Sequence, residues 1–315
     1  MANTKLITLA IVALAAILTP VGAASAATSV TVNSSGDLLI TGDNGAQDIH
    51  MTTNDDGQLV VEVENGSTTT IHVINGFHRD LIVDLKGGDD TFGVSYAGPL
   101  NAREVHLDLG GGANSAGLKG VSVRDLIEVR DLGGSSTVFF DEVDLDGDLD
   151  VAMGAGDNRF RGVVLAVDGE TSVTSGSNGS LDASFDVAIF RGPLSITGTN
   201  NVDSVTLKRV TVPFGAGPGL SVDTKGSADK VQLIRSDLDE PTEIKTGGGN
   251  DRLHVTLGII RDFEFNGGSG DDIVSTFGAS YVTSSVFNGS GGQDYISGEA
   301  NWFSNPPSLI SITAN

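Results

Sequence analysis

The stretch NGGSGDDIVS, residues 266–275, joins a turn signal to the start of an apolar run. Gly267, Gly268 and Gly270 favour a tight turn, because glycine adopts backbone angles that cost other residues free energy. Two adjacent aspartates follow, and the chain then resumes with Ile273 and Val274. The segment is either a plain turn between strands or one half of a cation-binding loop, and its recurrence in the chain bears on that choice.

The same combination of glycine, polar marker and new apolar residue recurs about every 22–23 residues. The markers are Asp90, Asn114, Ser136, Asn158, Ser180, Asp203, Asp229, Asp251, Asp272 and Asp294, with weaker copies near Asp48 and Thr70. The position seven residues before each marker is always apolar: Val63, Val83, Leu107, Val129, Val151, Val173, Ile196, Val222, Ile244, Phe265 and Phe287. The position two residues after the marker is also apolar in most copies, with exceptions at His72 and Asp182. The chain is therefore built from repeats.

Each repeat alternates apolar and polar residues with period two, as in LIVDLKGGDDTF from residue 81, which is typical of half-buried strands. Short strands in a repeat of this length predict a right-handed parallel β-helix (a solenoid) of about 11–12 coils with about 22 residues per coil. An antiparallel sandwich is the competing fold, but it does not require one column to stay apolar through every copy. We expect a single domain over residues 27–315, in which residues 297–315 form a C-terminal cap.

The composition and the N-terminus indicate an exported protein. Residues 1–26 read as a secretory signal peptide, with Lys5 before an apolar run and Ala24-Ser25-Ala26 as the cleavage site. No later stretch is long and apolar enough to span a membrane. The net charge is −23, which disfavours binding to nucleic acid or to anionic membranes. The chain has no cysteine, so thiolate-metal and thiol-nucleophile chemistry are excluded.

Residues 267–275, GGSGDDIVS, fit the nonapeptide G-G-x-G-x-D-x-U-x and in this respect the sequence resembles the calcium-binding repeats of repeats-in-toxin proteins. TGGGNDRLH (246–254) and GSGGQDYIS (289–297) are partial copies. The resemblance implies Ca²⁺ held between stacked turns, because carboxylate and carbonyl oxygens suit that hard cation. The implied carboxylate ligands are Asp251, Asp272 and Asp294, with Asp271 as a further charge, and the implied loop glycines are Gly247, Gly267, Gly268, Gly270, Gly289 and Gly292. The alternative is that these aspartates are solvated turn formers.

Three functions follow from this fold. The first is a non-catalytic, calcium-binding rod, secreted or on the cell surface, that acts in adhesion or matrix assembly. The second is a polysaccharide-active enzyme, for which the sequence offers no definite catalytic residue; the acidic run DEVDLDGDLD (141–150) would place Asp144, Asp146, Asp148 and Asp150 on one face of a strand. The third is a structural solenoid without bound metal. The expected partners are calcium and extracellular polysaccharide or surface proteins.

Overall fold

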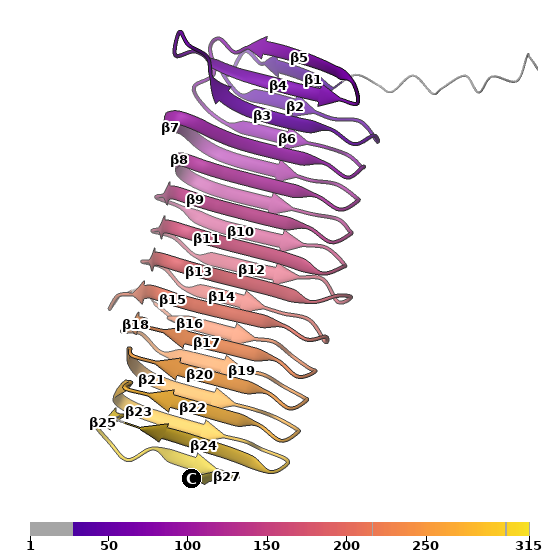
Figure 1. Cartoon of the computed structure of the whole chain (residues 1–315). Coiled ribbons are helices and arrows are strands. Elements are labelled where there is room, and N and C mark those ends of the chain that lie inside the picture. The colour runs from indigo at the N-terminus through magenta and orange to yellow at the C-terminus, as the bar shows by residue number, and fades with distance from the viewer. Residues whose placement is uncertain (1–27, 216, 300, 315) are drawn as a thin grey trace, which may run out of the picture.

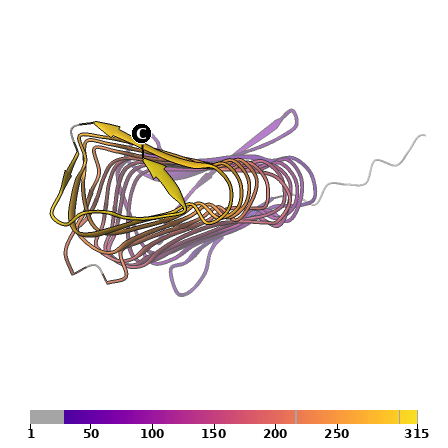
Figure 2. The same ribbon diagram turned by 90° about the horizontal axis from the view of Figure 1, so that it is seen from below.

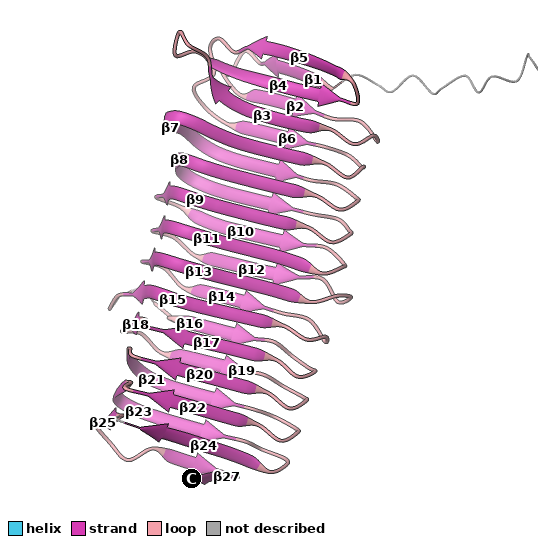
Figure 3. Cartoon of the chain, viewed as in Figure 1, coloured by secondary structure: helices cyan, strands magenta, loops and turns pink. Residues whose placement is uncertain are grey.

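The computed structural model describes residues 28–215, 217–299 and 301–314, with side chains omitted at 96–99 and 312–314. The predicted signal peptide lies outside the described residues. Every regular element in these ranges is a β-strand (Figure 3), and none of the described residues belongs to a helix that could cross a bilayer. The strands wind into a parallel β-solenoid of about 10 turns, with about 22 residues per turn (Figure 1).

Two long faces run the length of the solenoid. The first face contains β2 (Leu38–Thr41), β6 (Leu81–Asp84), the second halves of β7 (Thr91–Asp108) and β8 (Ser115–Arg130), then β10 (Asp148–Met153), β12 (Thr171–Ser175), β14 (Leu194–Thr197), β16 (Leu220–Asp223), β19 (Thr242–Lys245), β21 (Ile259–Asn266), β23 (Ser280–Asn288) and β26 (Ser308–Ile310). The second face contains β3 (Asp48–Thr53), the first halves of β7 and β8, then β9 (Thr137–Leu145), β11 (Asn158–Val167), β13 (Leu181–Phe190), β15 (Ser204–Val212), β17 (Lys230–Ile234), β20 (Arg252–Thr256), β22 (Ile273–Phe277), β24 (Asp294–Glu299) and β27 (Ile312–Ala314).

A view along the axis shows the coils superimposed, with a narrow rounded end and a broader angular end (Figure 2). The glycine-rich turns connect the first face to the second. At the broader end a short third side is formed by the ends of β9, β11, β13 and β15, by β18 (Asp237–Leu238), by the starts of β21 and β23 (residues 259–260 and 280–281) and by β25 (Trp302–Phe303). Residues 302–314 thus add a last parallel turn at the C-terminal end.

The predicted apolar columns form the core. All the positions seven residues before the markers are buried, from Val63 at 5% exposure to Phe287 at 0%. Phenylalanines stack on one another inside successive coils: the ring centroids of Phe140, Phe160 and Phe185 lie 5.5 and 5.1 Å apart. Such continuous contact stabilises each coil against its neighbours, because apolar area is removed from water at every step.

The N-terminal end departs from the predicted coil pattern. β1 (Ser29–Val32) pairs antiparallel with β2, and β4 (Leu59–Asn65) lies antiparallel between β3 and β5 (Thr68–Val73). The predicted repeat near Thr70 is therefore wrong, since Thr70 lies in an antiparallel hairpin. The hairpin replaces a coil, which explains why the number of turns is lower than the predicted 11–12. It also covers one end of the apolar interior.

The predicted marker Ser180 is wrong by one residue. Leu181, and not Ser180, pairs with Asn158, so that Ala183 continues the column that includes Phe160. The preceding turn contains one extra residue, and a shift by one residue moves side chains to the opposite face of a strand. The apparent break at Asp182 follows from this shift, and Asp182 points outward.

Candidate functional site

The marker residues form a hydrogen-bonded ladder inside the turns at the narrow end. In most coils the side chain of the marker accepts a hydrogen bond from the backbone N–H of the equivalent residue one turn earlier. The exception is the coil of Leu181, where the N–H of Asn158 donates to the backbone carbonyl of Ser180 over 2.7 Å. The N–Oδ1 distance is 2.8 Å from Asp203 to Asp229, 2.7 Å from Asp229 to Asp251, and 2.9 Å both from Asp251 to Asp272 and from Asp272 to Asp294. Asp90, Asn114, Ser136, Asn158 and Asp203 accept the same bond. The ladder satisfies backbone donors where the strands of the second face begin.

The aspartates of this ladder are buried. Asp251, Asp272 and Asp294 are exposed by 0%, 1% and 2%. The second carboxylate oxygen of Asp272 and of Asp294 has no hydrogen-bond partner among the described residues. These oxygens lie over Gly267 and Gly289, where an added Cβ atom would be 2.0 and 2.1 Å away from them. The two glycines therefore make room for the carboxyl groups.

Burial changes the protonation of the ladder. Removal from water disfavours the charged carboxylate and raises the pKa of Asp229 to about 7 and that of Asp272 to about 6. The neighbouring aspartates in the column raise both pKa values further, because like charges repel. The pKa of Asp90 is raised to about 6, again mainly by burial. The ladder can thus take up protons near neutral pH, where ordinary aspartates are fully ionised.

The glycines of the turns allow successive coils to approach closely. Gly268 and Gly270 have φ of 88° and 128°, and an added Cβ would lie 1.7 Å from the Gly247 carbonyl oxygen and 1.8 Å from that of Gly249. The Gly247 carbonyl accepts a hydrogen bond from the N–H of Ser269, 2.8 Å away. Similarly, Gly291 N–H donates to the Gly268 carbonyl over 2.9 Å. Several of the carbonyls predicted to bind calcium are therefore already engaged between coils.

Asp271 lies outside the ladder, on the exposed surface of its turn. Its backbone N–H donates to Asn250 Oδ1 over 2.9 Å, and its own Oδ1 accepts from the N–H of Gln293 over 2.8 Å. A second, outer row of side chain to backbone bonds thus follows the inner ladder. Asp271 and Asp272 point to opposite sides of the chain, as adjacent residues at the start of a strand do.

The structure brings the predicted ligands Asp251, Asp272 and Asp294 into one column but directs them inward. Among the described residues, no three His, Asp or Glu side chains converge in a way that could hold a metal ion. Calcium binding stays a prediction. The inward direction follows from the sequence pattern itself, since a marker lies on the same face as the apolar residue two positions later.

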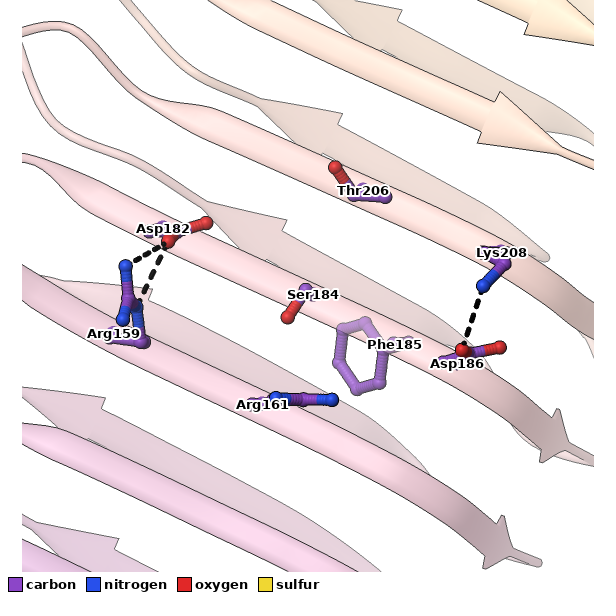
Figure 4. A pocket seen from close by; sticks show the side chains of 8 residues that line it. All are labelled: Arg159, Arg161, Asp182, Ser184, Phe185, Asp186, Thr206 and Lys208. Carbon is purple, nitrogen blue, oxygen red and sulfur yellow. Dashed lines mark hydrogen bonds and ion pairs between the residues drawn. The ribbon is translucent and has the colours of Figure 1, made fainter.

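The second face carries a shallow polar strip on β11, β13 and β15 (Figure 4). Arg159 pairs with Asp182 over 3.0 Å, and Lys208 pairs with Asp186 over 3.0 Å. Lys208 and Arg209 stabilise the charged form of Asp186, and its pKa is lowered although its partial burial acts in the opposite direction. The strip therefore pairs each of these two carboxyl groups with a basic side chain.

The acidic run 141–150 does not form one acidic face. β9 ends at Leu145 and β10 begins at Asp148 on the other long face, with a turn at residues 146–147 between them. Asp144 and Asp146 are exposed on one side of this turn, whereas Asp148 and Asp150 belong to the next strand. The expected single row of four aspartates is wrong, because the solenoid changes direction inside the run.

No protein-family model, curated protein or solved structure matches this chain. The class of the molecule, an all-β parallel solenoid, consequently rests on its strand pairing, and its function has to be argued from its own residues.

Proposed function

We propose that the protein is an exported, non-catalytic rod that acts in adhesion or matrix assembly outside the cell. The observation that carries the proposal is the marker ladder, in which a side chain joins most coils to the backbone of the preceding one. Ten turns at about 4.8 Å per turn give a stiff element about 50 Å long. Export is inferred from the N-terminal residues, and the expected partners are extracellular polysaccharides or surface proteins.

The polar strip supports this proposal over polysaccharide cleavage. Glycosidases need one protonated carboxylic acid beside an ionised carboxylate. In the strip, Asp182 and Asp186 are both paired with cations, and the raised pKa values belong to buried aspartates of the turns, namely ladder residues and Asp131. Substrate does not reach those buried groups. Charged, hydrogen-bonding side chains on a flat sheet are better suited to holding a polymer than to cutting it.

The experiment compares binding with cleavage. Purified residues 27–315 are incubated with acidic and neutral polysaccharides, and we expect retention on the polymer without new reducing ends or unsaturated products. The control is Asp182→Asn combined with Asp186→Asn, which removes both carboxylates of the strip. Product formation by the unchanged protein that this double variant abolishes would show an enzyme and overturn the proposal. Failure to bind any tested polymer would remove polysaccharide as the partner.

Calcium binding is a second candidate, supported by the unpartnered buried oxygens of Asp272 and Asp294. An ion there would replace the repulsion between stacked carboxylates with attraction, and folding would then depend on the ion. Calorimetric titration of Ca²⁺ into chelator-treated protein tests this, with Asp272→Asn as the variant and Asp55→Asn, an exposed turn residue, as control. Saturable binding that Asp272→Asn alone weakens supports calcium. Heat changes equal to those of the buffer at millimolar Ca²⁺ exclude it.

A further inference from the structure

An exposed apolar ridge lies on the short third side of the solenoid, at the middle coils. Val164, Val187 and Ile189 are exposed by 48%, 41% and 41%. Together with Ala166 they line a shallow groove that continues to Glu142 and Asp144 of the preceding coil. We name these four residues (Val164, Ala166, Val187 and Ile189) the ridge. An apolar cluster with a charged edge is typical of an interaction surface.

The backbone of the ridge is strained. Val164 and Val187 have φ of 51° and 60°, in the left-handed region that β-branched residues avoid. The neighbouring coils place Glu142 and Arg209 at the same corner, with φ of 57° and 55°. Glycine or asparagine would fit this corner with less strain, as Gly120 and Gly278 do elsewhere in the column. Val164 and Val187 thus present partly exposed apolar side chains side by side at a corner that does not require them, which indicates an interaction surface.

The charges that flank the ridge have opposite signs. One coil before the ridge stand Glu142 and Asp144, and one coil after it stands Arg209, which binds Asp186 through one carboxylate oxygen and remains half exposed. The strand registers order the corner residues as Glu142, Val164, Val187 and Arg209, one coil apart. The sequence of surface types along the rod is therefore acidic, apolar, apolar and basic.

We infer that this side of the solenoid binds a second copy of the same chain, with the two rods antiparallel. A two-fold axis that runs along the strands, between the coils of Val164 and Val187, places Val164 opposite Val187 of the second copy. The same axis places Glu142 opposite Arg209 of the second copy, and the pair occurs twice because a two-fold interface repeats each contact. A parallel arrangement would instead oppose Glu142 to the same acidic coil, so charge complementarity selects the antiparallel one.

The area of this surface sets the expected strength. Four coils about 4.8 Å apart and three outward rows about 7 Å apart cover on the order of 400 Å² per partner. Stable complexes bury about 800 Å² per partner, so the dimer is weak and reversible. We expect a dissociation constant on the order of 100 µM, so that the dimer dominates only where the rods are concentrated. Antiparallel pairing of this kind joins two rods side by side.

Charge reversal tests the arrangement. In a homodimer of Glu142→Arg, the substituted position lies opposite Arg209 of the partner at both contacts. In a homodimer of Arg209→Glu, the substituted position lies opposite Glu142 at both contacts. The dissociation constant of either homodimer should therefore be at least ten times that of the unchanged protein. An equimolar mixture restores two opposite-charge contacts, and sedimentation velocity should show the dimer again. Asp55→Arg is the control for charge alone and should dimerise as the unchanged protein does. A dimer insensitive to these substitutions, or a monomer at all concentrations up to about 1 mM, would overturn the inference.

Two further variants separate the interface from folding. Val164→Asn removes an apolar contact but suits the left-handed corner, so the melting temperature should rise while dimerisation weakens. Leu257→Asn, at the same corner of a distant coil with φ of 51°, should raise the melting temperature and leave dimerisation unchanged. Because the chain has no cysteine, Glu142→Cys mixed with Arg209→Cys should form a disulfide-linked dimer, whereas either variant alone should not. Loss of dimerisation in Leu257→Asn as well would refute the assignment to the ridge.

Discussion

Replacement of Asp229 by asparagine should make the protein more stable at neutral and alkaline pH. Asp229 is 2% exposed, accepts one hydrogen bond from the backbone of Asp203 and lies between two other ladder aspartates. Its pKa is raised from 3.8 to about 7, mainly by burial. Because the folded state binds this proton more tightly than the unfolded chain, the group stabilises the fold fully below about pH 4. That contribution is lost as the pH rises through about 7.

The magnitude follows from the difference between the two pKa values. A difference of one corresponds to about 1.4 kcal/mol, so the wild-type protein loses at most about 4 kcal/mol at this residue between pH 4 and pH 8. Asparagine keeps the Oδ1 acceptor and carries no charge at either pH, and its amide can donate to the Thr224 hydroxyl beside it. The ladder already contains Asn114 and Asn158 in the same role. We therefore expect Asp229→Asn to add about 2–4 kcal/mol at pH 8 and almost nothing at pH 4.

Urea denaturation from pH 4 to pH 8, with a chelator present to remove any bound calcium, measures this difference. The wild-type free energy of unfolding should decrease with rising pH, and that of Asp229→Asn should decrease less. Asp55→Asn, in an exposed turn, should follow the wild type. If Asp229→Asn is less stable than the wild type by the same amount at pH 4 and at pH 8, the substitution removes an interaction that does not depend on protonation of Asp229. That result would refute the reasoning.

Two further substitutions test the packing of the coils, both by urea denaturation. Gly268→Ala should lower the free energy of unfolding by about 2–4 kcal/mol, because its Cβ would lie 1.7 Å from a carbonyl oxygen at φ of 88°. In the control Gly291→Ala the Cβ meets nothing within 4 Å, and the change should be less than about 0.5 kcal/mol. Similar losses for both variants would contradict the close approach of the coils. Phe160→Ala should lower the free energy of unfolding by about 3–5 kcal/mol, because it leaves a cavity between two rings. Phe214→Ala, at a residue 82% exposed, should leave the free energy of unfolding nearly unchanged. A small loss in Phe160→Ala would mean that the core collapses around the gap.

The sequence predicts the repeat, the strand character and the stacked columns, because a solenoid places the same residue type at the same position in each coil. Period-two alternation identifies the buried residues, from Val83 to Phe287. The same alternation places the ladder aspartates on the inward side, although charged residues are usually exposed. The short third side was not predicted either. Its corner depends on positive φ at Glu142, Val164 and Arg209, which share no residue type and so leave no repeated signal.

The charged residues of the ladder are concentrated in the C-terminal coils of the rod. Asn114, Ser136 and Asn158 make the same backbone bonds without charge, whereas the five ladder positions from Asp203 to Asp294 are all aspartates. Each coil of a solenoid contacts only its immediate neighbours. A change that destabilises one coil therefore affects the adjoining coils first and the distant coils little. Ionisation at alkaline pH therefore weakens the coils from Asp203 to Asp294 more than the uncharged stretch from Asn114 to Asn158, and Asp90 adds one such group at the N-terminal end. A ladder of asparagines would not respond to pH, whereas the run of five aspartates makes the C-terminal coils respond to it.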